Sequence, residues 1–140
     1  MYVHESRIRV RYAETDQMGV AHHANYLLWL EVARTAYLEA IGYRYRDMEE
    51  RGSLLAVTEI NCRYLAPLRY DDEVVVKTWV QERKRLKLDF AYELYMDETL
   101  VARASTVLGC LNRDGRPQQL PEEVEKAIAD AMNTNDGNTE

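Results

Sequence analysis

The sequence contains only two cysteines, Cys62 and Cys110, in 140 residues. Two such distant thiols provide neither a disulfide framework nor the close spacing of a zinc site. No apolar run approaches the roughly 18 residues that a membrane-spanning helix needs. The opening MYVHESRIRV has charged residues where a signal peptide has an apolar block. These absences predict a soluble, cytoplasmic protein without a membrane span, in which both cysteines are reduced.

The chain also lacks an excess of positive charge, since its formal net charge is −6. Most of this charge lies in residues 121–140, where six acidic residues are balanced by Lys126 alone. That segment contributes −5, which leaves only −1 for residues 1–120. A nearly neutral body argues against a nucleic-acid partner but is compatible with a local basic patch that binds phosphates.

The composition is that of one folded domain. Hydrophobic residues make up 46% and charged residues 30% of the chain, which is typical of globular proteins. We expect a single domain over residues 1–132, because no linker, repeat or low-complexity segment divides it. Residues 133–140 are polar, and we expect them to form a frayed C-terminal tail.

One long apolar segment, residues 24–41, predicts a helix. Its polar stripe is narrow and consists of Glu31, Thr35 and Glu39. Gly42 follows at the position where a helix would end. A helix that is apolar over most of its circumference is surrounded by protein, so we expect the rest of the chain to wrap around it.

Alternation of apolar and polar residues predicts strands in much of the remaining chain. The clearest alternation lies at 86–96, and strands are also expected at 7–12, 54–65, 73–82 and 100–111. A short second helix is expected over 121–132. This order predicts an α+β fold in which a curved antiparallel sheet of about five strands wraps the long helix. The two open edges of such a sheet favour pairing with a second copy of the chain.

The residues suited to chemistry are concentrated in the polar segment before the long helix. Asp16, His22 and His23 lie there, with Gly19 where the backbone turns. The first N–H groups of a helix lack internal partners and bind anions. A carboxylate and an imidazole beside them suit acyl transfer. In such a site Asp16 attacks a carbonyl or deprotonates water, while the N–H of His23 or Ala24 stabilises the oxyanion.

These features also have structural interpretations, which stay open. Asp and His residues before a helix often cap it or lie in a solvated loop. A metal site is the weaker alternative, because the adjacent His22 and His23 lack the i, i+4 spacing of a helical ligand pair. The basic run at Lys84, Arg85 and Lys87 is either a solvated strand end or a phosphate site.

The stretch YAETDQMGVAHHANYLLWLEVAR resembles the N-terminal signature of hotdog-fold acyl-CoA thioesterases of the 4-hydroxybenzoyl-CoA thioesterase type. The Asp-x-x-Gly…His-x-x-Tyr pattern before an aromatic-rich helix carries the resemblance. It continues through PLRYDDEVVVKTWVQE and covers roughly residues 5–120. The chain looks closest to the small bacterial branch that includes the Tol–Pal-cluster thioesterases. The resemblance implies the hotdog fold, with a long central helix inside a curved antiparallel sheet.

The resemblance also implies roles for individual residues. The essential aspartate of the family falls on Asp16. The accompanying histidine, whose main-chain N–H is the oxyanion donor, falls on His23, and a frequent tyrosine falls on Tyr12. These three are the catalytic candidates. Candidates for substrate and CoA binding are Asn25, Tyr26, Lys84, Arg85 and Lys87.

The implied activity is hydrolysis of an acyl-CoA thioester to a carboxylic acid and CoA, with Asp16 as nucleophile or general base. CoA is then part of the substrate, and no cofactor or metal is required. The implied partners are acyl-CoA, or acyl carrier protein as another acyl donor, and further copies of the chain in a homodimer or homotetramer. Two other functions stay open: binding of acyl-CoA or acyl carrier protein without hydrolysis, and a hotdog dehydratase.

Overall fold

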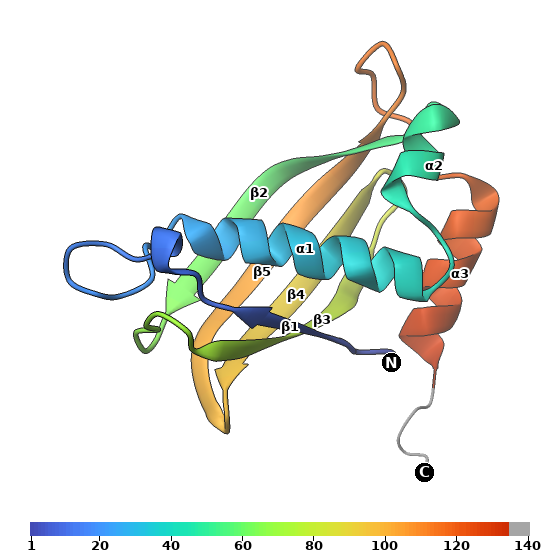
Figure 1. Cartoon of the computed structure of the whole chain (residues 1–140). Coiled ribbons are helices and arrows are strands. Elements are labelled where there is room, and N and C mark those ends of the chain that lie inside the picture. The colour runs from blue at the N-terminus through green and yellow to red at the C-terminus, as the bar shows by residue number, and fades with distance from the viewer. Residues whose placement is uncertain (135–140) are drawn as a thin grey trace.

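A curved antiparallel sheet forms the body of the molecule (Figure 1). The computed structural model describes residues 1–134. The strand order is β1-β3-β4-β5-β2. The strands are β1 (His4–Arg9), β2 (Leu54–Tyr64), β3 (Glu73–Arg83), β4 (Lys87–Met96) and β5 (Thr99–Leu111). The helices are the 3-10 turn η1 (Tyr12–Glu14), α1 (Asn25–Ala40), α2 (Tyr45–Glu50) and α3 (Glu122–Asn133).

The long helix α1 crosses one face of the curved sheet, and its inner side forms the centre of the core (Figure 1). The buried positions recur every three or four residues, which places them on one side of the helix. They are Tyr26, Trp29, Leu30, Ala33, Arg34, Tyr37 and Leu38. The ring of Tyr37 meets that of Phe90 on β4 edge to face, with centroids 5.7 Å apart. This packing confirms the predicted α+β arrangement of a long helix against a five-strand antiparallel sheet.

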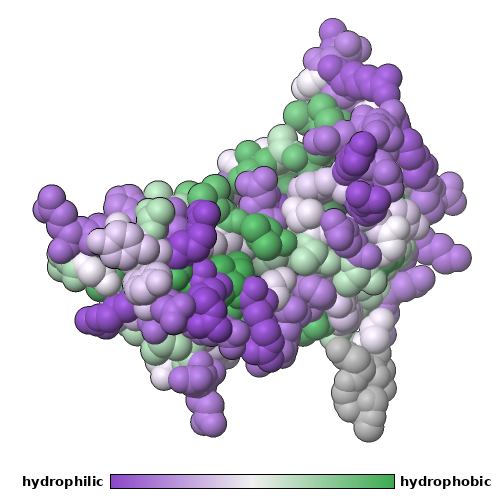
Figure 2. Space-filling model, viewed as in Figure 1, coloured by the Kyte–Doolittle hydropathy of each residue, from purple (hydrophilic) through white to green (hydrophobic). Residues whose placement is uncertain are grey.

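The sheet covers the inner side of α1, but the outer side of the helix is not covered within residues 1–134. Leu28 and Val32 are 53% and 55% exposed. Figure 2 shows hydrophobic surface over α1, surrounded by hydrophilic side chains. The reason is that a sheet of this size covers one side of a helix, whereas the apolar composition of α1 extends around most of it.

Most predicted element boundaries are confirmed to within two residues, as β2 to β5 and α3 show. The first strand is the exception, because β1 ends at Arg9 rather than at residue 12. The chain turns there into η1: the Arg11 N–H donates to Glu14 Oε1 at 2.8 Å, and the Glu14 N–H donates to the Arg11 carbonyl at 2.9 Å. The helix α2 was not predicted, since six residues are too few to show a helical period.

No helix within residues 1–134 is long and apolar enough to cross a membrane. The expected frayed tail at 133–140 falls, from residue 135 on, outside the described residues. The single-domain boundary at residue 132 stays a prediction, and α3 ends at Asn133.

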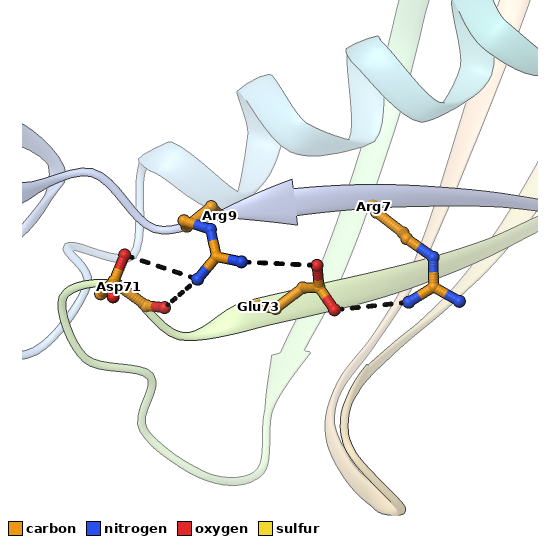
Figure 3. Close-up of polar contacts among 4 residues, drawn as sticks. All are labelled: Arg7, Arg9, Asp71 and Glu73. Carbon is orange, nitrogen blue, oxygen red and sulfur yellow. Dashed lines mark hydrogen bonds and ion pairs between the residues drawn. The ribbon is translucent and has the colours of Figure 1, made fainter.

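The two edges of the sheet differ in character. On β1, Arg7 and Arg9 lie beside carboxylates of the neighbouring β3 segment (Figure 3). Arg7 Nη1 is 3.4 Å from Glu73 Oε1, and Arg9 Nη1 is 3.5 Å from Asp71 Oδ1. Charged side chains discourage a further strand from pairing with an edge. On β2, the apolar Val57 and Ile60 are 41% and 47% exposed, beside the charged Glu59 and Arg63. Because β2 is the edge with exposed apolar side chains, we expect it to be the pairing edge.

Gly42, two residues after the last residue of α1, offers a test of how this helix ends. Gly42 has φ +105°, a conformation that L side chains rarely adopt, and nothing lies within 4 Å of an added Cβ. We expect Gly42→Ala to lower the free energy of unfolding by about 1 kcal/mol through backbone strain alone. Chemical denaturation measures this change.

The matched control is Gly109→Ala on β5. Gly109 has no left-handed φ, and an added Cβ would lie 3.8 Å from Cγ2 of Thr58, an ordinary contact. We expect this variant to unfold like the wild type to within about 0.5 kcal/mol. Equal destabilisation by both substitutions would contradict the role assigned to Gly42.

Candidate active site

A pocket of about 380 Å³ opens where the start of α1 meets the end of β2. Three elements contribute to its walls: the loop after η1, the first residues of the helix and the segment that follows β2. The lining residues are Asp16, Val20, Ala21, His23, Tyr26, Tyr64, Leu65, Ala66 and Pro67. The structure thus brings together three predicted site residues, Asp16, His23 and Tyr26, with a wall from residues 64–67 that the sequence did not indicate.

The loop around Asp16 orients its carboxylate. Asp16 Oδ1 accepts the N–H of Met18 at 2.8 Å and the N–H of Val20 at 3.4 Å. Gly19, with φ +81°, donates its N–H to the Asp16 carbonyl at 2.9 Å and closes the turn. Within residues 1–134, Asp16 Oδ2 makes no hydrogen bond. One oxygen is therefore fixed by the loop, and the other is available to a substrate or a water.

The helix-capping interpretation of Asp16 is not supported. The N-cap of α1 is Ala24, and Asp16 contacts the loop instead. His22 is the residue that serves the helix, because its Nδ1 accepts the Ala24 N–H at 3.1 Å. Its ring stacks on that of His23, with centroids 4.2 Å apart. Of the two adjacent histidines, His23 lines the pocket and His22 supports the start of the helix.

The backbone donors at the start of α1 are almost all occupied. The N–H groups of residues 25–27 donate to the carbonyls of residues 22–24 at 3.0–3.3 Å. The Ala24 N–H is taken by the His22 ring. The His23 N–H makes no hydrogen bond to any described residue. Of the two predicted oxyanion donors, only the His23 N–H is available, and it lies at the positive end of the helix dipole.

Glu14 connects the loop to the helix from a buried position. It is 5% exposed, and its carboxylate accepts the Trp29 indole N–H at 3.1 Å and the Arg11 N–H at 2.8 Å. Its carbonyl accepts the His22 N–H at 2.8 Å. Burial raises the pKa of Glu14, but these hydrogen bonds and the Arg11 guanidinium outweigh it, so the pKa lies below its usual value.

Tyr12 and Asn25 are predicted site residues that lie outside the pocket lining. Tyr12 is 76% exposed and meets the ring of Tyr70 edge to face, with centroids 5.8 Å apart. Asn25 donates its side-chain N–H to the Glu14 carbonyl at 2.9 Å and so joins helix and loop. Their roles in catalysis and substrate binding stay predictions.

The predicted phosphate-binding residues lie far from the pocket in the same chain. Lys84 and Arg85 form the turn between β3 and β4, and Lys87 pairs with Gly109 on β5. Tyr64, at the pocket, faces Ala102 on the same strand. Seven residues of β5 separate the two places, which corresponds to about 24 Å. The basic run therefore cannot reach a ligand in its own pocket without an extended ligand or a second chain.

Tyr64 is one of the pocket residues that the sequence did not indicate, and it contacts the predicted site directly. Its hydroxyl donates to the His23 carbonyl at 3.0 Å. Its ring meets the Tyr26 ring edge to face, with centroids 4.8 Å apart. The only sequence signal is an aromatic residue at a strand end, three residues before Pro67. That signal does not distinguish a pocket wall from ordinary core.

The two thiols and the metal alternative contribute little to the site. Cys62 and Cys110 are both free, and burial raises the pKa of each thiol. A raised pKa disfavours the thiolate form that acts as a nucleophile. No group of three or more His, Cys, Asp or Glu side chains among residues 1–134 is arranged to hold a metal ion. Asp16, His23 and the main chain beside them are thus the groups suited to reaction at this pocket.

The buried carboxylate predicts a pH-dependent stability. Glu14→Gln loses charge-assisted hydrogen bonds, so we expect the free energy of unfolding at pH 7 to fall by about 1–3 kcal/mol. Because folding lowers the pKa of Glu14, its stabilisation is complete above the unfolded pKa near 4.5 and is lost as the pH falls through the folded pKa. Denaturant titrations from pH 7 to pH 3 should show the two proteins converging in acid.

The matched control is Glu31→Gln, on the exposed side of α1. An exposed glutamate should change the stability by less than about 0.5 kcal/mol at any of these pH values. A Glu14→Gln effect that is as small, or that grows in acid, would contradict the contribution assigned to the buried carboxylate.

Comparison with known proteins adds independent evidence. Residues 10–128 match the family described as the thioesterase-like superfamily. The chain is 47% identical over 95 residues to the putative acyl-CoA thioesterase YneP of Bacillus subtilis, across 68% of this chain and 69% of that protein. It is 30% identical over 123 residues to the acyl-CoA thioesterase YbgC of Haemophilus influenzae, across 86% and 90%.

Solved structures agree with this relationship. A DHNA-CoA thioesterase from Staphylococcus aureus is 35% identical with a TM-score of 0.93, covering 100% of this chain and 97% of that chain. A 4-hydroxybenzoyl-CoA thioesterase shares the fold, with a TM-score of 0.84 at 20% identity over 91% of this chain and 99% of that one. The hotdog prediction is confirmed, while the Tol–Pal-cluster branch stays a prediction. With its sheet, its central helix and these relatives in agreement, the chain belongs to the thioesterase-like superfamily.

Proposed function

We propose that this protein hydrolyses acyl-CoA thioesters to a free carboxylic acid and CoA at the pocket between α1 and β2. One observation carries the proposal: a carboxylate with an unbonded oxygen, Asp16, shares this pocket with His23, whose main-chain N–H is unbonded within the described residues. Nucleophile or base and oxyanion donor are the two parts that acyl transfer needs. Relatives that are named acyl-CoA thioesterases support the substrate class.

The proposed reaction proceeds from the thioester carbonyl in the pocket. The His23 N–H donates to the carbonyl oxygen, where negative charge develops, and the dipole of α1 adds to the stabilisation. Asp16 either attacks the carbonyl carbon, which gives a mixed anhydride that water then hydrolyses, or removes a proton from an attacking water. The thiolate of CoA is a good leaving group and leaves without a strong acid. In this scheme the His23 ring orients the water or the carbonyl, and no metal or redox cofactor takes part.

The pocket walls favour an apolar or aromatic acyl group. Tyr26, Tyr64 and Leu65 present rings and an aliphatic side chain next to Asp16. The solved neighbours named above are a DHNA-CoA thioesterase and a 4-hydroxybenzoyl-CoA thioesterase, and 4-hydroxybenzoyl is an aromatic acyl group, so aromatic acyl-CoAs are the first substrates to test. Release of free thiol from aromatic and medium-chain aliphatic acyl-CoAs measures the preference. Related Arabidopsis thioesterases are named for acyl carrier protein, and the corresponding acyl carrier protein thioesters belong in the same panel. We place the reaction in the cytoplasm, where CoA thioesters and free thiols coexist.

We further propose that two copies of the chain pair along β2. The open β2 edge supports this arrangement, since the β1 edge carries the arginine ion pairs described above. An antiparallel two-fold pairing would place the start of one β2 beside the end of the other. The basic residues Lys84, Arg85 and Lys87 of one copy would then lie at the same end of the paired strands as the pocket of the other copy. In this arrangement the basic residues of one copy would contact the CoA phosphates of a ligand in the other copy's pocket.

The decisive variant is Asp16→Asn. The amide keeps the size of the side chain and accepts the same loop hydrogen bonds, but it is neither a nucleophile nor a base. We expect kcat for the best acyl-CoA substrate to fall by at least ~10²-fold, with KM changed little. His23→Ala should cost less, because the main-chain donor remains.

The same substitution at a distant turn, Asp114→Asn, is the matched control and should keep wild-type kcat. Asp114 is exposed in the loop between β5 and α3. Circular dichroism and denaturation establish that all variants are folded. Near-wild-type turnover by folded Asp16→Asn would exclude Asp16 from the mechanism and leave it a structural role in the loop.

The basic turn predicts a binding effect rather than a chemical one. Replacing Lys84, Arg85 and Lys87 together by glutamine should raise KM for acyl-CoA without lowering kcat, because phosphate contacts are equal in ground and transition states. High salt should shrink the difference, since exposed charges are screened. An unchanged KM at low ionic strength would identify the run as a solvated turn.

Mixed oligomers test whether the pocket and the basic turn belong to different copies. Asp16→Asn chains refolded with an equal amount of the triple variant would form hybrid dimers. In each hybrid, one site combines the intact Asp16 pocket of the triple variant with the intact basic turn of the Asp16→Asn chain. Random mixing should restore low-KM activity to about a quarter of the sites. If no such activity returns although hybrids form by mass, the two elements act within one chain.

A further inference from the structure

Tyr64 connects the end of the edge strand β2 to the start of α1. It is the last residue of β2, and its hydroxyl donates to the His23 carbonyl at 3.0 Å. The same carbonyl accepts the Tyr26 N–H at 3.2 Å. The Tyr64 ring also meets the His23 ring edge to face, with centroids 6.2 Å apart. Tyr64 thus contacts both the side chain and the main chain of the residue that provides the free N–H.

Two rigid peptide groups meet at His23. The group that contains its N–H also contains the His22 carbonyl, which accepts the Asn25 N–H at 3.0 Å. The group that contains its carbonyl also contains the Ala24 N–H, which donates to His22 Nδ1 at 3.1 Å. Because each peptide group is planar, only the φ and ψ of His23 separate the two orientations. A bond that fixes the His23 carbonyl therefore also restricts the direction of its N–H.

We propose that Tyr64 is a positioning residue that fixes the His23 main chain, so that its N–H meets the oxyanion in the correct geometry. The proposal rests on the proposed function, in which that N–H is the oxyanion donor. A catalytic constellation has to be held to within about 0.5 Å and 10–20°. The helix bonds of His23 run along α1, whereas the Tyr64 bond comes from the sheet and fixes the peptide from a second direction.

The chemistry of the Tyr64 hydroxyl suits a permanent donor. Partial burial raises the pKa of Tyr64 to about 12, and the neighbouring Cys62 thiol adds to the shift. The hydroxyl therefore stays protonated at neutral pH, and in this proposal it does not itself exchange a proton in the reaction. Removal of the Tyr64 hydroxyl should lower kcat by the same factor at every pH and leave unchanged the pH values at which the rate declines.

The test compares Tyr64→Phe with Tyr70→Phe. Each removes one tyrosine hydroxyl, but Tyr70 does not line the pocket, and its hydroxyl makes no hydrogen bond within the described residues. Its ring meets that of the exposed Tyr12 edge to face. We expect kcat of Tyr64→Phe to fall about tenfold, a fraction of the 10²–10³-fold cost of deleting an oxyanion donor. KM should change by less than about twofold, and Tyr70→Phe should match the wild type.

A second measurement is independent of turnover. In the 1H–15N spectrum, the amide resonances of His23 and Ala24 should shift in Tyr64→Phe and stay in place in Tyr70→Phe. Unchanged kcat together with unchanged amide resonances would overturn the proposal, as would a moved pH limb, which would indicate proton transfer by Tyr64. The proposed function is tested by a different result: full activity of Asp16→Asn would contradict it, independently of the activity of Tyr64→Phe.

Discussion

The burial of the inner side of α1 against the curved sheet is the interaction on which the site depends. Tyr26, Trp29 and Tyr37 are each at most 3% exposed, and a fully buried large side chain contributes about 1.5–3 kcal/mol. These contacts determine where the helix lies on the sheet. The helix start then meets the end of β2, where the rings of Tyr26 and Tyr64 touch. The pocket exists because these two element ends coincide.

The second constraint is that the backbone N–H groups at the start of α1 need acceptors. Carbonyls one turn back serve residues 25–27, and the His22 ring serves Ala24. Glu14 accepts from His22 with its carbonyl and from Trp29 with its carboxylate, so the loop and the helix are joined at a buried point. The His23 N–H is left over within residues 1–134, beside Asp16 in the pocket. Because the N–H groups of residues 24–27 all have acceptors, the His23 N–H is the donor that remains for the proposed chemistry.

The third constraint comes from the edges of the sheet and from the outer side of α1. The β1 edge carries exposed arginine ion pairs, which contribute at most about 1 kcal/mol each but discourage pairing. Exposed apolar side chains lie on β2, at Val57 and Ile60, and on the outer side of α1, at Leu28 and Val32. In the proposed dimer the β2 edge serves a chemical purpose as well, because the basic turn at residues 84–87 needs a second copy to approach the pocket. Assembly and substrate binding would then depend on the same edge.

The sequence by itself determined the long helix, four of the five strands and the identity of Asp16 and His23 as site candidates, because apolar periodicity and short motifs are local. It misplaced the end of β1, where a side-chain hydrogen bond of Glu14 closes a turn that alternation does not reveal. Only the tertiary structure decided which histidine lines the pocket and that Tyr64 contacts His23. The Glu14–Trp29 and Tyr64–His23 contacts join residues 15 and 41 positions apart. Such contacts depend on how the helix and the sheet pack, and no local pattern in the chain records that packing.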